Sequence, residues 1–136
     1  MKYLRLIVAG VAVPISTLLV ITVVAAGYGV RLGFAARGAP DQRVITNFAA
    51  SLGRDYWTIL QILLAVPSAF WGSRTFREAA ALYGAMVGAL AAAIELAVMR
   101  NFAASLLVEA GLMVGAGWLG GLLAASRYRA AEKPVK

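Results

Sequence analysis

An apolar run from Leu6 to about Val30 places the strongest constraint on how this chain can fold. It is interrupted only by one proline and a few hydroxyl side chains. A helix of about 20 apolar residues crosses the hydrocarbon core of a membrane, so we predict a span over about 6–30. Lys2 and Arg5 would suit the start of a signal peptide, but the apolar part of such a peptide has only about 7–15 residues. We therefore expect the segment to be retained.

The composition supports a lipid environment. Of 136 residues, 62% are hydrophobic and 14% charged. A soluble chain this short could not cover that much apolar area in its own core. The net charge is +7, but the 13 Lys and Arg residues stand singly or in pairs at the ends of apolar runs. This pattern is typical of membrane proteins, so we expect the lipid bilayer as a partner and no nucleic acid.

Three further apolar runs follow, over about 56–73, 79–99 and 106–126, and a polar tail covers 127–136. Prolines inside two of the predicted spans are interpreted as kinks, because neighbouring helices can satisfy the freed carbonyl groups. The sequence therefore predicts an all-α integral membrane protein. It has four transmembrane helices and forms a single domain over 1–136.

The long connection between the first two spans contains a predicted interfacial helix over about 41–53. Pro40 disfavours helix before it, and Asp41 can cap the next free N–H groups. Gly53 would suit the helix end. An irregular loop is the alternative. One predicted helix face carries the large apolar side chains, at Val44, Ile45, Phe48 and Leu52.

The hexapeptide NFAASL occurs twice, at 47–52 and 101–106. Aligned without gaps, 41–55 lies over 95–109, and the acidic residues at both ends of the two stretches superpose. We interpret the echo as an internal duplication that gives two tandem helical hairpins. Parallel repeats of this kind are a known membrane architecture.

Basic residues predict the orientation. With four spans, the N-terminus, the 73–78 loop and the C-terminus share one side and carry eight Lys and Arg residues, against five on the other side. The positive-inside rule then places both termini in the cytoplasm. The Ala-, Gly- and Arg-rich sequence has the character of a bacterial multi-pass protein of the cell (inner) membrane.

A candidate polar intramembrane site consists of Glu95, Glu109, Gln61 and Arg100. In one interpretation the carboxylates are interfacial, and Glu95 reaches the headgroups or Arg100. In the other they form a functional site, since ionisable residues inside a membrane are often functional. Two carboxylates brought together in a low dielectric would share a proton.

Small residues predict how the helices pack, because they let two helices approach closely. Gly84 and Gly88 share a stripe with Glu95, which should therefore face another helix. The last predicted span carries small residues on two nearly opposite faces, so it should pack on two neighbours, one of which can be another subunit. The candidate packing residues are Gly84, Gly88, Gly111, Gly115, Gly117 and Gly120.

The sequence contains no cysteine, no histidine, no phosphate-binding loop and no nucleophile elbow. We therefore expect no catalytic residue, no metal and no cofactor, and the chain is not predicted to be an enzyme. The favoured hypothesis is a non-catalytic accessory or scaffolding subunit that packs against a larger membrane complex or against itself. The alternative is a small oligomeric proton- or cation-coupled transporter or channel that uses the intramembrane carboxylates.

Overall fold

The computed structural model describes residues 2–99 and 104–131, and within these ranges the chain is helical, without strands. The predicted all-α class is confirmed. A 3₁₀ turn, η1 (Arg77–Ala79), precedes α3. The α-helices are α1 (Lys2–Ala36), α2 (Gln42–Ser73), α3 (Ala80–Met99) and α4 (Ala104–Ala131).

Three stretches of the described helices are long and apolar enough to cross a membrane: Tyr3–Ala36, Ala80–Val98 and Leu106–Arg127. The chain therefore has the features of a multi-pass membrane protein. No stretch of α2 is among them. Its second half, predicted as a span over 56–73, is less apolar because it includes Gln61 and several hydroxyl and tryptophan side chains.

The predicted interfacial helix and the following predicted span form one continuous helix, α2. The helix start is as predicted: the Oδ1 atom of Asp41 accepts a hydrogen bond from the backbone N–H of Arg43 at 2.9 Å. The predicted end at Gly53 is wrong, since α2 continues to Ser73. A glycine ends a helix when it takes a positive φ, and none of the described glycines does so.

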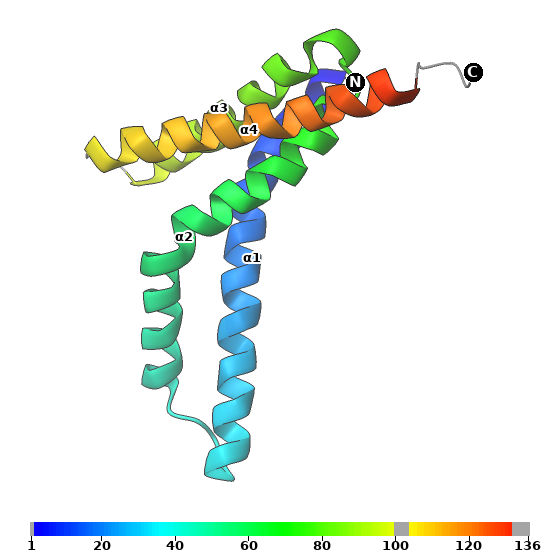
Figure 1. The fold of residues 1–136 in the computed structure, drawn as a ribbon. Coiled ribbons are helices and arrows are strands. Elements are labelled where there is room, and N and C mark those ends of the chain that lie inside the picture. The colour runs from blue at the N-terminus through cyan, green and yellow to red at the C-terminus, as the bar shows by residue number, and fades with distance from the viewer. Residues whose placement is uncertain (1, 100–103, 132–136) are drawn as a thin grey trace.

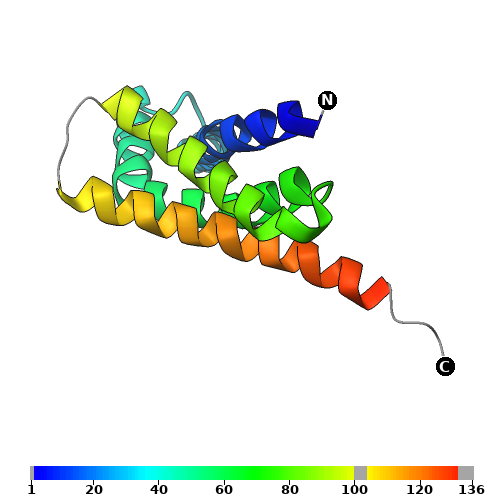
Figure 2. The same cartoon turned by 90° about the horizontal axis from the view of Figure 1, so that it is seen from above.

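The four helices form two antiparallel hairpins that lie across each other (Figures 1 and 2). The beginning of α1 and the second half of α2 pack against α3 and α4, and together these segments are called the bundle. The remainder of the first hairpin, residues 18–36 of α1 and 42–54 of α2, extends away from the bundle (Figure 1). This part is called the projecting arm.

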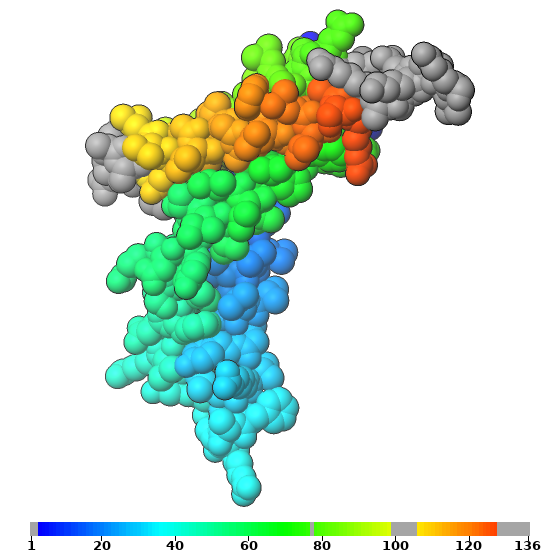
Figure 3. Space-filling model, viewed as in Figure 1, coloured from blue at the N-terminus to red at the C-terminus, as the bar shows by residue number. Residues whose placement is uncertain are grey.

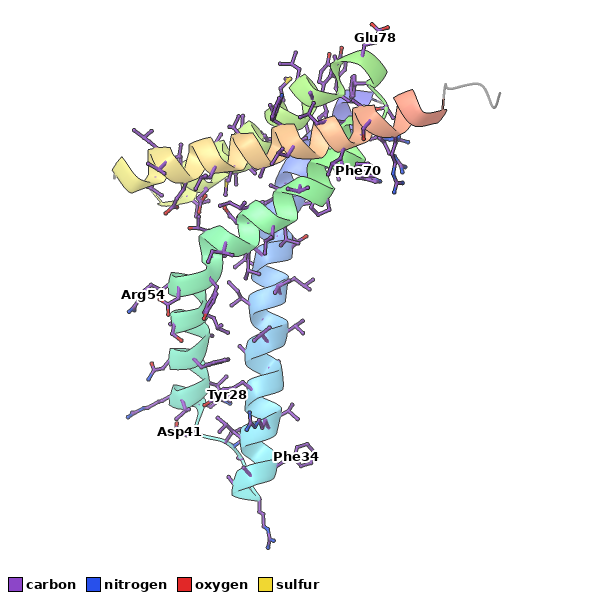
Figure 4. All side chains as sticks on the ribbon, in the orientation of Figure 1. Tyr28, Phe34, Asp41, Arg54, Phe70 and Glu78 are labelled. Atoms are coloured by element: carbon purple, nitrogen blue, oxygen red, sulfur yellow. The ribbon has the colours of Figure 1, made fainter. Side chains whose placement is uncertain are left out.

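Within the arm, α1 and α2 pack through an aromatic stack. The rings of Tyr28 and Phe48 lie 4.0 Å apart, centroid to centroid. Arg54 points away from α1 (Figure 4). The arm part of α1 exposes Thr22 and Arg31, and its other exposed side chains are apolar. Its exposed large hydrophobic side chains are Leu18, Leu19, Val23, Val24, Val30 and Phe34.

Glycines bring α3 and α4 into backbone contact. A Cβ atom on Gly88 would collide with the carbonyl oxygen of Met113, and one on Gly84 would collide with that of Gly117. Gly121, which is not among the predicted packing residues, meets the carbonyl oxygen of Ala80 in the same way. The α3–α4 hairpin thus depends on the absence of side chains along its contact line.

The other selected glycines of α4 divide between two environments. Gly120 lies against the backbone of α2, because a Cβ atom there would collide with the carbonyl oxygen of Val66. Gly111 and Gly115 have no atom within 4 Å of such a Cβ, so they border open space. The bundle therefore uses one small-residue face of α4 and leaves the other uncovered.

An aromatic cluster at one side of the bundle joins the start of α1, the α2–α3 connection and the start of α3. The ring of Phe76, between α2 and α3, stacks on Tyr83 of α3 with 3.8 Å between the centroids. Tyr3, near the start of α1, lies 5.8 Å from Phe76. The end of α4 lies at the same side (Figure 1). The chain thus returns through α2 to the end from which α1 started.

The two NFAASL copies lie in different settings. The copy at 47–52 lies inside α2, in the projecting arm. Of the copy at 101–106, residues 101–103 lie outside the described residues, and the others open α4. The prediction of two tandem helical hairpins that arose by duplication is therefore not confirmed and stays a prediction.

Candidate functional site

Glu95 lies inside the bundle, one turn before the end of α3, and only 6% of its surface is exposed. The indole Nε1–H of Trp57, on α2, donates a hydrogen bond to Glu95 Oε1 at 2.6 Å. This hydrogen bond joins two helices where the second half of α2 crosses α3.

Gln61 completes the group and is fully buried. In the amide orientation that satisfies its neighbours, its nitrogen donates to Glu95 Oε2 at 2.9 Å, and its oxygen accepts from Trp57 Nε1 at 3.1 Å. Each of the three side chains then bonds to the other two. Trp57, Gln61 and Glu95 are called the polar cluster.

The helical repeat of α2 explains why two of its residues meet one acid. Trp57 and Gln61 are four residues apart, and side chains at this spacing lie on the same helix face. The same face continues through Ala65 and Ala69, which are fully buried. Their small side chains let α2 approach the neighbouring helices, so the amide of Gln61 reaches Glu95.

Burial makes the partners of Glu95 energetically important. A buried carboxylate without hydrogen bonds is strongly unfavourable, and a hydrogen bond to a charged group contributes about 1.5–3 kcal/mol. Here both carboxylate oxygens accept hydrogen bonds. The polar cluster therefore fastens α2 to α3 at one defined position.

The structure brings together two of the four predicted site residues, Gln61 and Glu95. Glu109, on α4, is half-buried and lies within electrostatic range of Glu95. Arg100 lies outside the described residues. That these residues form a functional site stays a prediction.

Sequence reasoning missed Trp57, which is not among the predicted site residues. The available signal was its spacing of four residues from Gln61, a buried amide in an otherwise apolar run.

The polar cluster offers a single carboxylate, that of Glu95, and both of its oxygens already accept hydrogen bonds. Across residues 2–99 and 104–131, no group of three or more Asp or Glu side chains could hold a metal ion. Comparisons with family models, with curated proteins and with solved structures find no match to this chain.

Proposed function

We propose that this chain is a non-catalytic membrane subunit that scaffolds or packs against a larger membrane complex. The closed polar cluster carries the proposal. Both oxygens of Glu95 are occupied by donors from α2, so the buried acid joins two helices and presents no free atom to a solute. A carrier site, in contrast, needs polar atoms that can exchange partners during transport.

The projecting arm supports the same proposal, because it is amphipathic as a hairpin. Apart from Thr22 and Arg31, the exposed side chains of α1 in the arm are apolar, whereas α2 exposes Arg43, Asn47 and Arg54. With α3 and α4 crossing the bilayer, the arm runs along the membrane plane, with α2 toward the end of the bundle where α3 meets α4 (Figure 1). We propose that the arm lies in the outer leaflet, with the polar side of α2 facing water.

A four-span topology accompanies this proposal. The start of α1, the connection between α2 and α3, and the end of α4 all lie on one side of the bundle (Figure 1). Such an arrangement requires α2 to return across the membrane, even though it is less apolar than the other helices. Its polar Gln61 does not face lipid, since it is fully buried. In the proposed topology both termini are cytoplasmic, and the arm lies in the outer leaflet with the 31–55 connection on the external side.

Photocrosslinking tests the partner directly. A benzoylphenylalanine at Val23 probes the apolar side of the arm, one at Arg54 probes its polar side, and one at Leu82, an exposed position of α3, is the bundle control. In native membranes, we expect a discrete protein adduct from the arm positions and weaker labelling from Leu82. Absence of any protein adduct at both arm positions would contradict the proposed subunit function.

A carrier is the second candidate, and the proximity of Glu109 to buried Glu95 favours it. Two variants separate the two functions. A subunit should keep its assembly in Glu95→Gln, since an amide retains the shape and hydrogen bonding, and lose it in Gly88→Leu, which forces α3 and α4 apart. A proton-coupled carrier should lose ion flux in Glu95→Gln while its assembly is unchanged. Flux through reconstituted vesicles and recovery of the co-purifying complex are the measurements.

A further inference from the structure

A groove runs along the surface between α2 and α4. One part, of about 370 Å³, is lined by Val66, Pro67 and Phe70 from α2 and by the end of α4. A second part, of about 430 Å³, is lined by Ile62 and Val66 from α2 and by the middle of α4. The two parts share Val66, so they follow one another along the same pair of helices. Together they are called the α2–α4 groove.

The middle part of the groove is hollow because α4 carries glycines there. Gly111 and Gly115 border open space, and neither has an atom within 4 Å of where a Cβ would lie. Their neighbours in the groove, Trp118 and Leu119, are apolar and partly exposed. A flexible hydrocarbon chain can fill a channel of this kind.

The groove ends at a cation. Arg127 lines its last part, and its guanidinium lies 5.3 Å from the centroid of the Phe70 ring. Phe70 lies beneath the final turns of α4 (Figure 4), and Figure 3 shows α4 against the second half of α2 on this face. Among the residues that the structure describes, Arg127 has no carboxylate partner. A positively charged side chain thus lies at one end of the apolar α2–α4 groove.

The length of the groove matches a lipid chain. From Gly111 to Arg127, α4 rises about 24 Å, at about 1.5 Å per residue. One leaflet of the hydrocarbon core is about 15 Å deep, half of a core of about 30 Å. An acyl chain anchored at Arg127 would therefore remain inside the groove over the depth of its leaflet.

We propose that the α2–α4 groove binds an anionic phospholipid, with one acyl chain between α2 and α4 and the phosphate against Arg127. The charge of Arg127 complements the phosphate, and basic pockets between transmembrane helices bind anionic headgroups in this way. Because Arg127 lies at the end that carries the α2–α3 connection, the bound lipid belongs to the leaflet on that side.

Native mass spectrometry of the full chain tests the proposal. The protein, purified in mild detergent, is mixed with equal amounts of dioleoyl-phosphatidylglycerol and dioleoyl-phosphatidylcholine, and the bound lipid is identified by mass. We expect preferential retention of phosphatidylglycerol. Arg127→Gln should reduce this preference about fivefold, because one basic side chain near a membrane surface contributes about that factor. Arg54→Gln, which removes the same charge from the arm, should leave it unchanged.

A second pair of variants tests the apolar part of the groove. Gly115→Leu fills the channel, so it should reduce the total lipid retained. Gly27→Leu adds the same side chain at a glycine of α1 that also borders open space, and it should not. This pair also decides the proposal if Arg127→Gln does not fold. Equal retention of the two lipids by the natural chain, an unchanged preference in Arg127→Gln, unchanged retention in Gly115→Leu, or a lipid-free dimer would overturn the proposal.

Discussion

The polar cluster shows how a single acid can be placed inside an apolar bundle. Glu95 is accommodated because an indole N–H and an amide reach it from one face of α2. Such a cluster determines which turn of α2 meets α3 more than it adds stability. An apolar contact could replace it in stability but would not determine this register. The contribution of the cluster to stability becomes measurable when one of its three side chains is replaced and the other two stay buried.

At the residue scale, Trp57→Phe should lower the free energy of unfolding by about 1–3 kcal/mol, because it leaves Glu95 without its indole donor. Glu95→Gln should cost less, since the new amide can still accept from Trp57. Trp118→Phe is the matched control, because Trp118 is 48% exposed. Unfolding in detergent, followed by circular dichroism, gives the three values. Equal losses in Trp57→Phe and Trp118→Phe would show that the cluster does not fasten the helices.

At the element scale, the contact between α3 and α4 is made of backbone more than of side chains. Gly88 and Gly84 of α3 meet α4 where any side chain would collide with main-chain atoms, which cannot move aside as a flexible side chain can. In lipid, helices associate through such close packing because no hydrophobic driving force brings them together. The α3–α4 hairpin is therefore more sensitive to added volume than to lost volume.

Gly88→Ala should thus destabilise the protein by about 1–3 kcal/mol, the range for overpacking a filled site. Gly111→Ala is the control on α4. It adds the same methyl group to open space and should be neutral, or stabilising by about 0.5–1 kcal/mol through helix propensity. Titration with a denaturing detergent measures both variants. A destabilising effect of Gly111→Ala as large as that of Gly88→Ala would mean that a partner covers this face.

The projecting arm depends on the stack between Tyr28 and Phe48. Phe48→Ala should destabilise the arm by about 1–2 kcal/mol, from the lost ring contact and partial burial. Phe34→Ala is the control, since Phe34 is 82% exposed in the same arm. Hydrogen exchange of the α1 and α2 amides should increase in the arm of Phe48→Ala and not in Phe34→Ala. Uniform exchange across arm and bundle would show that the two unfold together.

At the scale of the whole molecule, the crosswise hairpins determine which parts of the chain face the same side. Tyr3, Phe76 and Tyr83 join the start of α1, the α2–α3 connection and the start of α3 at one end of the bundle. The tip of the arm, near Gly38, lies far from them (Figure 1). A topology experiment can therefore distinguish a returning α2 from one that stays on the outer side.

Cysteine labelling provides that experiment, because the natural chain has no cysteine. Gly38→Cys, Glu78→Cys and Lys136→Cys are treated in intact cells with a thiol reagent that does not cross membranes. We expect labelling of the cysteine at 38 from outside, and labelling at 78 and 136 only after the cells are opened. External labelling at 78 would show that α2 does not cross the membrane and would contradict the four-span topology.

Helices were predictable from the sequence wherever a local cause determines them. Apolar runs determine α1, α3 and α4, and the Asp41 cap determines where α2 begins. The continuity of α2 through Gly53 was not predictable in this way, because tertiary contacts of the following turns decide whether a glycine ends a helix. The crosswise arrangement of the hairpins is likewise a property of packing, which hydropathy does not encode.

The candidate site was predictable in part for the same reason. Polar residues in apolar runs are visible in a sequence, so Gln61 and Glu95 were selected. Trp57 was not, since an indole close to a charged pair has the features of a membrane-surface anchor. Only the angle at which α2 crosses α3 turns its N–H toward the acid. The open side of Gly111 and Gly115 also became clear only once the neighbours of α4 were placed.

The order of the polar cluster along the chain has a consequence for biosynthesis. A ribosome makes Trp57 and Gln61 before it makes Glu95, so in the proposed four-span topology both donors are already in the membrane when α3 enters it. An acid released alone into hydrocarbon would be costly, whereas one released beside waiting donors is bonded as it enters. The insertion machinery can therefore release α3 directly against α2. Glu95, the residue of α3 that is most costly to place in lipid, then meets Trp57 and Gln61 as soon as it enters the membrane.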